Sequence, residues 1–141
     1  MEIDDVTGVI VDAAVKIHRD LGSRLFESVY EVTLAALLER RGLHVVRQHP
    51  IGFTYEGIEF THGFRADLVV ERCVLVELKV TDRLTSTQRT QLLTYLRLGG
   101  FRVGLVLNFG AEAMKDGIKR VVNDHLPSAF SPLRVNRPLR Q

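Results

Sequence analysis

Cysteine is almost absent from this sequence, since Cys73 is the single cysteine among 141 residues. One thiol can neither close an internal disulfide nor build a cysteine metal cluster, so we expect a reducing, cytoplasmic setting. Long apolar runs are absent too, because none approaches the ~18 residues that a membrane span requires. The acidic start MEIDDVTGVI lacks the basic region of a secretory signal. We therefore expect neither a membrane-spanning nor a secreted protein.

Proline is scarce through most of the chain, and so is an excess of charge of either sign. Three of the four prolines fall after residue 126, together with Arg134, Arg137, Arg140 and no acid, which is typical of a loose terminal extension. The remaining sequence has the length of one domain. A hydrophobic content of 45% with a net charge of +2 excludes disorder as its main state. We predict a single domain over residues 1–126 and a flexible basic tail over residues 127–141. The pI near 8.9 permits an anionic partner without requiring one.

Apolar periodicity divides the chain into helical and extended parts. Residues 4–21 and 25–41 carry apolar side chains at three- and four-residue steps, which predicts two amphipathic helices, the second ended by Gly42. Thr85 and Gln88 have the spacing of a capping box, which predicts a helix over residues 85–98. The predicted strands lie at residues 43–53, 58–62, 64–70, 74–80, 101–108 and, in preference to a helix, 117–123. This order predicts an α/β sandwich with a mixed sheet.

Residues 64–80 (FRADLVVERCVLVELKV) carry the most informative pattern. A hairpin centred on Arg72 places Asp67 opposite Glu77, and opposite residues of an antiparallel pair share a face. One face of this hairpin is then wholly apolar, with Ala66, Leu68, Val70, Val74, Val76, Leu78 and Val80. A two-residue loop would instead place Asp67 opposite Val76 and mix the two faces. The hydrophobic pattern therefore selects the register that brings the two carboxylates together.

Asp67 and Glu77 would repel each other as neighbours, and burying either one is costly. A divalent cation with oxygen ligands would relieve that repulsion, and Mg²⁺ suits one or two carboxylates plus a substrate phosphate. Lys79 projects from the same face as Glu77, where its charge can orient an attacking water or offset charge on a phosphate. The hairpin alone equally allows a structural interpretation, in which Lys79 simply neutralises both carboxylates on the sheet surface.

Asp67 followed by Glu77-Leu78-Lys79 resembles the signature of the PD-(D/E)XK nuclease superfamily, which has a carboxylate on one strand and (D/E)-x-K on the next. Residues 3–123 as a whole are similar to a small bacterial group placed in that superfamily, the GxxExxY proteins. The matching stretches are residues 21–31 (LGSRLFESVYE), the positions Gln48, Pro50, Tyr55 and Gly57, residues 64–79, residues 91–96 (QLLTYL) and residues 104–110 (GLVLNFG). A lone D…ExK is a weak pattern, whereas this ordered set over most of the chain is much more specific.

The resemblance implies a fold, an activity and a set of site residues. The fold is α/β with a restriction-endonuclease-like core, a mixed β-sheet flanked by helices on both sides. The activity is Mg²⁺-dependent hydrolysis of phosphodiester bonds in nucleic acid, with Mn²⁺ as a substitute for Mg²⁺ and DNA as the favoured substrate. The implied site residues are the metal ligands Glu27, Asp67 and Glu77, of which the last two are also catalytic, the catalytic lysine Lys79, and the Q-x-x-x-Y pair Gln91 and Tyr95. Arg24 stands where the family motif has its first glycine, at the entry to the helix of Glu27.

Some of these residues also have purely structural interpretations. Glu27 falls in the first turn of a predicted helix, where an acid favours the dipole. Tyr95 lies near Leu92 and Leu96 and so also fits a core position. The second functional hypothesis is therefore a catalytically silent protein of the same fold that binds nucleic acid or serves in an assembly. A domain of this size has no separate recognition module, so a homodimer or a partner would supply substrate choice.

Overall fold

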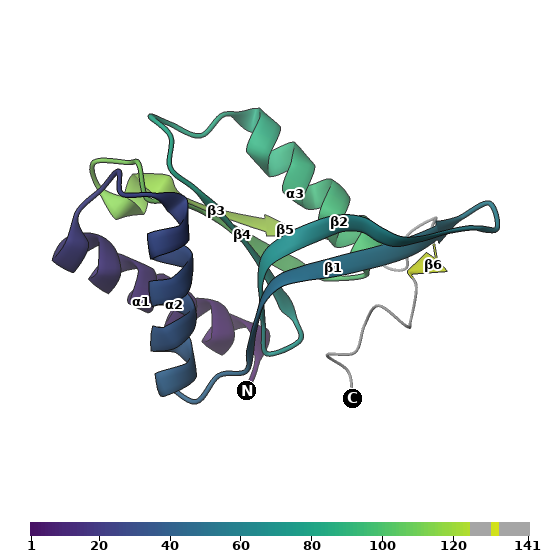
Figure 1. Cartoon of the computed structure of the whole chain (residues 1–141), viewed down its shortest axis with the longest axis horizontal. Helices are drawn as coiled ribbons and strands as arrows, with labels where there is room; N and C mark the ends of the chain where they lie inside the picture. The colour runs from purple at the N-terminus through teal and green to yellow at the C-terminus, as the bar shows by residue number, and fades with distance from the viewer. Residues whose placement is uncertain (125–130, 133–141) are drawn as a thin grey trace.

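The computed structural model describes residues 1–124 and 131–132 of the chain. Its elements are, in chain order, α1 (Ile3–Leu21), α2 (Glu27–Arg40), β1 (Val45–Tyr55), β2 (Ile58–Val70), β3 (Val74–Lys79), α3 (Ser86–Gly99), β4 (Val103–Asn108), the short 3-10 helix η1 (Met114–Gly117), β5 (Ile118–Val122) and β6 (Ser131–Pro132) (Figure 1). They build one six-stranded sheet in the order β5-β4-β3-β2-β1-β6. β3 and β4 pair in parallel, while the other neighbours are antiparallel. The predicted mixed sheet of an α/β fold is confirmed.

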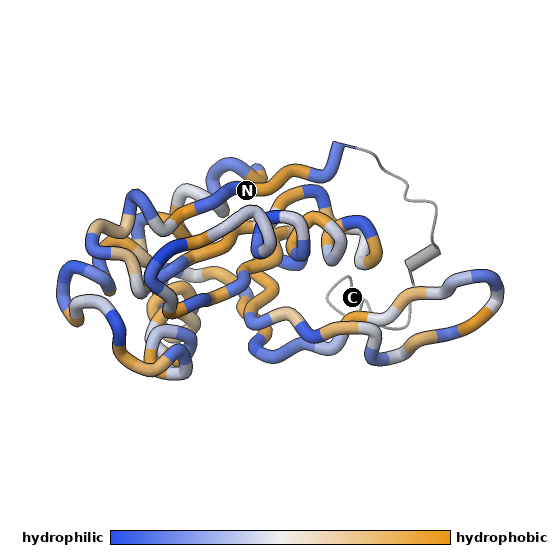
Figure 2. The backbone as a smooth tube through the Cα atoms, turned by 90° about the horizontal axis from the view of Figure 1, so that it is seen from above, coloured by the Kyte–Doolittle hydropathy of each residue, from blue (hydrophilic) through white to orange (hydrophobic). Residues whose placement is uncertain are grey.

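Helices cover both faces of the sheet. On one face, α1 and α2 contribute to a buried apolar cluster in which Leu34 packs with Leu78. On the other face, Leu92 and Leu96 of α3 join Leu75 in a second buried cluster. Figure 2 shows apolar stretches running through the body and along the outer part of β1 and β2, with polar stretches in many of the connecting loops. The predicted arrangement, with helices on both sides of a mixed sheet, is therefore confirmed.

Local sequence signals set the ends of the helices. The predicted capping box is confirmed at α3, where Thr85 donates its backbone N–H to Gln88 Oε1 at 2.8 Å. The same helix ends at Gly100, whose φ of 75° is the left-handed conformation that glycine adopts without strain. α2 begins at Glu27, two residues later than predicted, because Phe26 is its extended N-cap residue. Among the described helices, none combines the length and the apolar character that crossing a membrane would require.

The hairpin register predicted from the hydrophobic pattern is confirmed. The paired residues are Leu68–Val76, Val69–Leu75 and Val70–Val74. Arg72 lies at the centre of the loop, which is closed where Cys73 donates its backbone N–H to the Val70 carbonyl at 3.1 Å. The apolar face that contains Leu68, Val76 and Leu78 packs against α1 and α2, because these side chains belong to one buried cluster.

Two details of β2 differ from the prediction. The strands predicted at residues 58–62 and 64–70 form a single strand, because Gly63 continues it and leaves room for the Phe53 ring, which a Cβ at that position would meet. Ala66 does not share the cluster of Leu68 but packs with Ile51 on the α3 side. Between Leu68 and Ala66 the β1–β2 ladder is interrupted, because no pair forms between Arg47–Leu68 and His49–Ala66.

The outer part of β1 and β2 forms a hairpin that projects from the body (Figure 1). Its turn consists of Glu56 and Gly57, both at positive φ, 51° and 77°, as a tight two-residue hairpin turn requires. β6 pairs with Phe53 and Thr54 of β1. The rest of the predicted basic tail lies outside the described residues. The preference for a strand over residues 117–123 is confirmed by β5, which pairs with β4.

Candidate active site

Asp67 and Glu77 lie where the backbone ladder between β2 and β3 ends. The last regular pair is Leu68–Val76, and beyond it the two side chains accept hydrogen bonds from backbone groups of the opposite strand. The backbone N–H of Asp67 donates to Glu77 Oε1 at 3.3 Å, and the backbone N–H of Leu78 donates to Asp67 Oδ2 at 2.8 Å. Glu77 stays in register with Val106 of β4. Two crossed hydrogen bonds thus hold the two carboxyl groups together at the point where the strands separate.

Burial sets the charge state of this pair. Glu77 is 8% exposed. Burial, followed by repulsion from Asp67, raises the pKa of Glu77 from 4.5 to about 8. Burial also raises the pKa of Asp67, against the opposing effect of the Leu78 N–H. The Lys79 ammonium lowers the pKa of both carboxyl groups without cancelling the rise. The pair therefore holds a proton near neutral pH unless a cation takes its place.

Lys79 and Glu27 reach the same region from two different elements. Lys79 is the last residue of β3 and is half-buried. Glu27 is the first residue of α2 and is exposed overall. Partial burial of its carboxyl group raises the pKa of Glu27, the charge of Asp67 adds to the rise, and Lys79 opposes it. The structure therefore brings the three predicted acids and the predicted lysine within electrostatic range of one another.

The donor set suits a hard cation that keeps part of its water. Asp67 and Glu77 present carboxylate oxygens at one point, and burial, with their mutual repulsion in the case of Glu77, raises their pKa values there. Among the described residues, no group of three or more His, Cys, Asp or Glu side chains is arranged to hold a metal ion. Glu27 thus lies near the pair without closing a three-carboxylate shell. Mg²⁺ commonly binds through one or two carboxylates plus waters and substrate phosphate, so this pair fits it.

The two predicted α3 residues are placed differently from each other. Tyr95 stacks on Phe64 with ring centroids 4.1 Å apart and packs beside the second apolar cluster. Burial, followed by the charges of Glu77 and Asp67, raises the pKa of its hydroxyl group, which therefore lies near the carboxyl pair. Gln91 is exposed one helical turn earlier, and within the described part of the chain no hydrogen bond joins it to the pair. Tyr95 is thus both a packing residue and a neighbour of the site.

The backbone after Lys79 is held by the end of β4. Phe109 donates its backbone N–H to the Lys79 carbonyl at 2.8 Å. The buried side chain of Asn108 accepts from the Thr81 N–H and donates to the Thr81 carbonyl, both at 3.0 Å. Gly110 completes the junction, since a Cβ at this position would overlap the Thr81 backbone. The segment that carries Lys79 therefore has a fixed path where it leaves the sheet.

Arg24 explains why a glycine suits the helix entry. Its φ is 69°, in the left-handed region that disfavours residues with a Cβ. The backbone N–H of Arg24 donates to the Phe109 carbonyl at 3.1 Å, which holds this conformation. Its side chain donates from Nη1 to Asp82 Oδ1 at 2.7 Å, an exposed ion pair between the loops before α2 and after β3. α2 therefore begins at Glu27 with Arg24 in the glycine position.

Comparing two substitutions at Arg24 separates the backbone conformation from the ion pair. Both Arg24→Gly and Arg24→Ala remove the ion pair with Asp82, but only glycine relieves the left-handed backbone. We expect Arg24→Gly to be more stable than Arg24→Ala by about 1 kcal/mol. Urea unfolding of the two variants, with the wild type as reference, measures this difference. Equal stability of the two variants would contradict the strained conformation at this position.

The sequence interpretation missed a network that adjoins Asp67. Glu31 of α2 is 5% exposed. Arg47 contacts its Oε2 from both Nε and Nη2 at 3.0 Å. Gln48 Nε2 donates to Glu31 Oε1 at 2.6 Å and to Asp67 Oδ1 at 3.4 Å. The position of Gln48 among the motif residues was the only sign of this network in the sequence. The pairing of β1 with β2, which brings Gln48 opposite Asp67, was not predicted.

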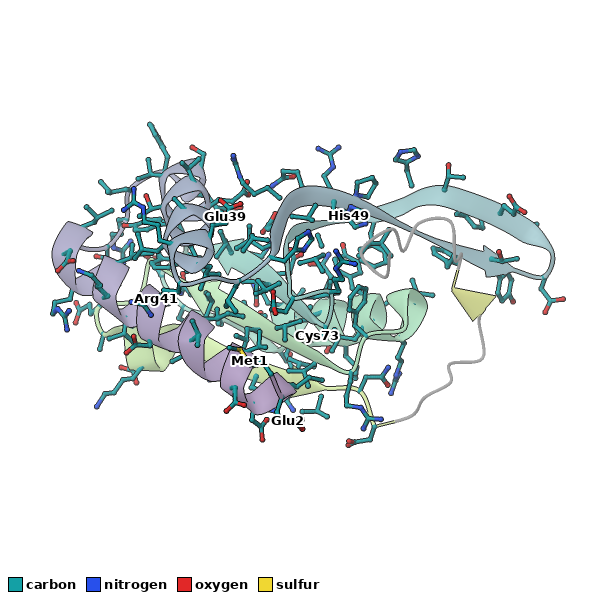
Figure 3. All side chains as sticks on the ribbon, turned by 90° about the horizontal axis from the view of Figure 1, so that it is seen from below. Met1, Glu2, Glu39, Arg41, His49 and Cys73 are labelled. Atoms are coloured by element: carbon teal, nitrogen blue, oxygen red, sulfur yellow. The ribbon has the colours of Figure 1, made fainter. Side chains whose placement is uncertain are left out.

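Cys73 lies away from this site. It precedes β3, whose other end carries Lys79, so the strand separates the two by roughly 20 Å. Figure 3 shows Cys73 beside Met1. Burial, followed by the charge of Glu71, raises the pKa of the thiol, which disfavours a nucleophilic thiolate.

The comparisons with known proteins agree with this geometry at the level of the superfamily. The model of the PD-(D/E)XK nuclease superfamily matches residues 4–121, a span that includes every candidate site residue named above. The chain therefore belongs to the PD-(D/E)XK nuclease superfamily. No significant match to the chain was found among curated proteins or among solved structures. Membership of the GxxExxY group within the superfamily stays a prediction.

Proposed function

We propose that this protein is a metal-dependent nuclease of the cytoplasm that hydrolyses phosphodiester bonds, with DNA as its substrate. The observation that carries the proposal is the pair of carboxyl groups, Asp67 and Glu77, held together at the fork between β2 and β3 within reach of the Lys79 charge. A buried carboxyl group held beside a second acid favours cation binding, because a cation then replaces the proton and offsets the repulsion.

Asp67 and Glu77 would hold Mg²⁺, with Mn²⁺ as a substitute and Glu27 as the nearest further carboxylate. The ion would lower the pKa of a bound water and offset negative charge on the phosphate. The protein's own contribution is to fix the donors. The Leu78 N–H holds Asp67 Oδ2, and the Asp67 N–H holds Glu77 Oε1, so neither carboxyl group has to reorganise when substrate arrives.

Lys79 acts beside this pair through its ammonium group. Its position at the end of β3 is fixed by the bond from Phe109 to its carbonyl. Nζ donates hydrogen bonds that orient the attacking water or offset charge on a phosphate oxygen. Tyr95 closes the α3 side of the site, where its stack on Phe64 holds the hydroxyl group near the carboxyl pair. Gln91, exposed on the same helix, would contact the substrate backbone.

Replacing Lys79 separates metal binding from catalysis. We expect Lys79→Met to bind Mn²⁺ at least as well as the wild type, because a positive charge has been removed beside the carboxylates. Cleavage of a DNA panel with Mg²⁺ should fall by about 10²–10⁴-fold, as expected for loss of a positioned acid–base or charge-stabilising group. Calorimetry and single-turnover cleavage measure the two effects. Lys115→Met, which replaces an exposed lysine of η1, is the matched control and should cleave like the wild type.

Wild-type cleavage by Lys79→Met would contradict this mechanism. The silent alternative predicts a different pattern. If the protein is catalytically silent, the wild type binds DNA, and its metal binding does not depend on Asp67. Asp67→Asn then binds metal no more weakly than the wild type does. A homodimer, the assembly expected for a domain without a separate recognition module, is tested by sedimentation of the same samples.

A further inference from the structure

The β1 strand contains a backbone distortion directly beside the site. Gln48 has a φ of 50°, in the left-handed region, in the middle of β1. The other non-glycine residues at positive φ in the described part of the chain lie in turns or loops. Pairing with β2 continues on both sides, at Arg47–Leu68 and at His49–Ala66, and skips Gln48 and Asp67. Strained residues of this kind gather at functional sites, where surrounding contacts hold them.

The distortion lies on one side of Asp67 and Glu77 lies on the other. Towards β3, the backbone N–H of Asp67 donates to Glu77 Oε1 beyond the last regular β2–β3 pair. The side chain of Gln48 then approaches Asp67, and Nε2 donates to Oδ1 at 3.4 Å. The other oxygen, Oδ2, already accepts from the Leu78 N–H. Both oxygens of Asp67 therefore have a donor that sets their direction.

The amide of Gln48 is itself anchored from the other side. An amide nitrogen carries two N–H groups, and here one donates to Glu31 Oε1 at 2.6 Å while the other faces Asp67. Glu31 is buried, and its second oxygen is held by Arg47. A chain of contacts thus runs from Arg47 through Glu31 and Gln48 to Asp67. The short hydrogen bond to Glu31 fixes the position of the Gln48 amide. The longer contact from this amide then orients the carboxyl group of Asp67.

We infer that Gln48 is a positioning residue, held by Glu31 and Arg47, that orients Asp67 Oδ1 for the cation. This inference rests on the proposed function, because it assigns Asp67 to metal binding. A carboxyl oxygen keeps further lone pairs after accepting one hydrogen bond, so the Gln48 contact orients Oδ1 and leaves it able to bind a cation. Partners of this kind commonly affect metal affinity as well as activity.

The decisive experiment compares Gln48→Gly with Glu56→Gly. Both substitutions replace a strained non-glycine residue at nearly the same φ, 50° for Gln48 and 51° for Glu56. Gln48 lies in β1, and Glu56 lies in the turn between β1 and β2. Only the first removes the amide beside Asp67. We expect Mn²⁺ affinity, measured by calorimetry with the metal alone, to fall by about 10–100-fold in Gln48→Gly and to stay unchanged in Glu56→Gly. Gln48→Asn, one methylene shorter and tolerant of left-handed backbone, should lose affinity as Gln48→Gly does.

A second readout needs no metal. The side-chain amide resonances of Gln48, assigned by their loss in Gln48→Gly, should shift in Asp67→Asn, because the acceptor of one N–H changes. Unchanged resonances would overturn the inference. Wild-type Mn²⁺ affinity in a folded Gln48→Gly or Gln48→Asn would overturn it too, while leaving the proposed function intact. If the wild-type protein binds no Mn²⁺, the proposed function fails, and a shift of the amide resonances would still support the positioning of Asp67 by Gln48.

Discussion

Glu77→Gln is expected to lose about 10³-fold or more of the Mg²⁺-dependent cleavage rate while the fold is kept. The substitution removes one of the two carboxylate charges and leaves the shape of the side chain. Glutamine retains Oε1, so the hydrogen bond from the Asp67 N–H at 3.3 Å survives. The loss of activity is therefore electrostatic. Removing several kcal/mol of charge stabilisation in the transition state lowers the cleavage rate by about 10³-fold.

This expectation is checked by single-turnover cleavage of DNA at saturating Mg²⁺, with circular dichroism as the measure of folding. Glu56→Gln in the exposed hairpin turn removes the same charge far along the hairpin and serves as the control. A Glu77→Gln protein that cleaves within about tenfold of the wild type would exclude Glu77 from the catalytic machinery, since one factor of ten corresponds to only ~1.4 kcal/mol.

The same substitution should stabilise the metal-free protein in alkaline solution. The folded-state pKa of Glu77, about 8, lies above its ordinary value of 4.5. Between these values the unfolded chain has lost the proton that the folded protein keeps, so the unfolded state binds fewer protons. Stability from this group is therefore fully present below about pH 4.5 and is lost as the pH rises towards 8. The raised pKa of Asp67 acts in the same direction.

Glutamine at position 77 is neutral at every pH, so Glu77→Gln should lack this part of the decline. At ~1.4 kcal/mol per pH unit, the full effect is at most on the order of 4–5 kcal/mol. We expect Glu77→Gln to exceed the wild type in free energy of unfolding near pH 8.5 with EDTA present, and to match it near pH 4.5. Urea unfolding across this range measures the difference. If the free energies of unfolding of the two proteins change in parallel with pH, Glu77 does not keep a proton in the folded state above its ordinary pKa. Saturating Mg²⁺ should narrow the gap, because it stabilises the wild type through the ionised pair.

A gain in stability together with a loss of activity is the expected signature of a functional site. A buried pair of acids next to one another is unfavourable for folding. The chain nevertheless places Asp67 and Glu77 together and supports them with backbone N–H groups. Replacing either acid with an amide relieves the repulsion and removes the attraction for a cation, so stability and activity should change in opposite directions.

Much of the architecture follows from short-range patterns. The hairpin register was predictable because the apolar residues of both strands have to share a buried face, which leaves one alignment. The α3 start was predictable because Thr85 and Gln88 satisfy each other's backbone groups locally. The prediction of two strands in place of β2 was wrong, because Gly63 is usually a break and here accommodates the Phe53 ring.

The sequence by itself determined the pairing of Asp67 with Glu77 and the side of the strand that Lys79 occupies. Both depend on alternation along two strands joined by a short loop. Only the tertiary structure decided the rise in pKa of Glu77, the approach of Glu27 and the chain from Arg47 to Asp67. These depend on burial beneath helices and on a distortion of β1 opposite β2. Contacts between segments so distant in the chain leave no periodic trace in either segment, because each segment meets its local preferences without the other.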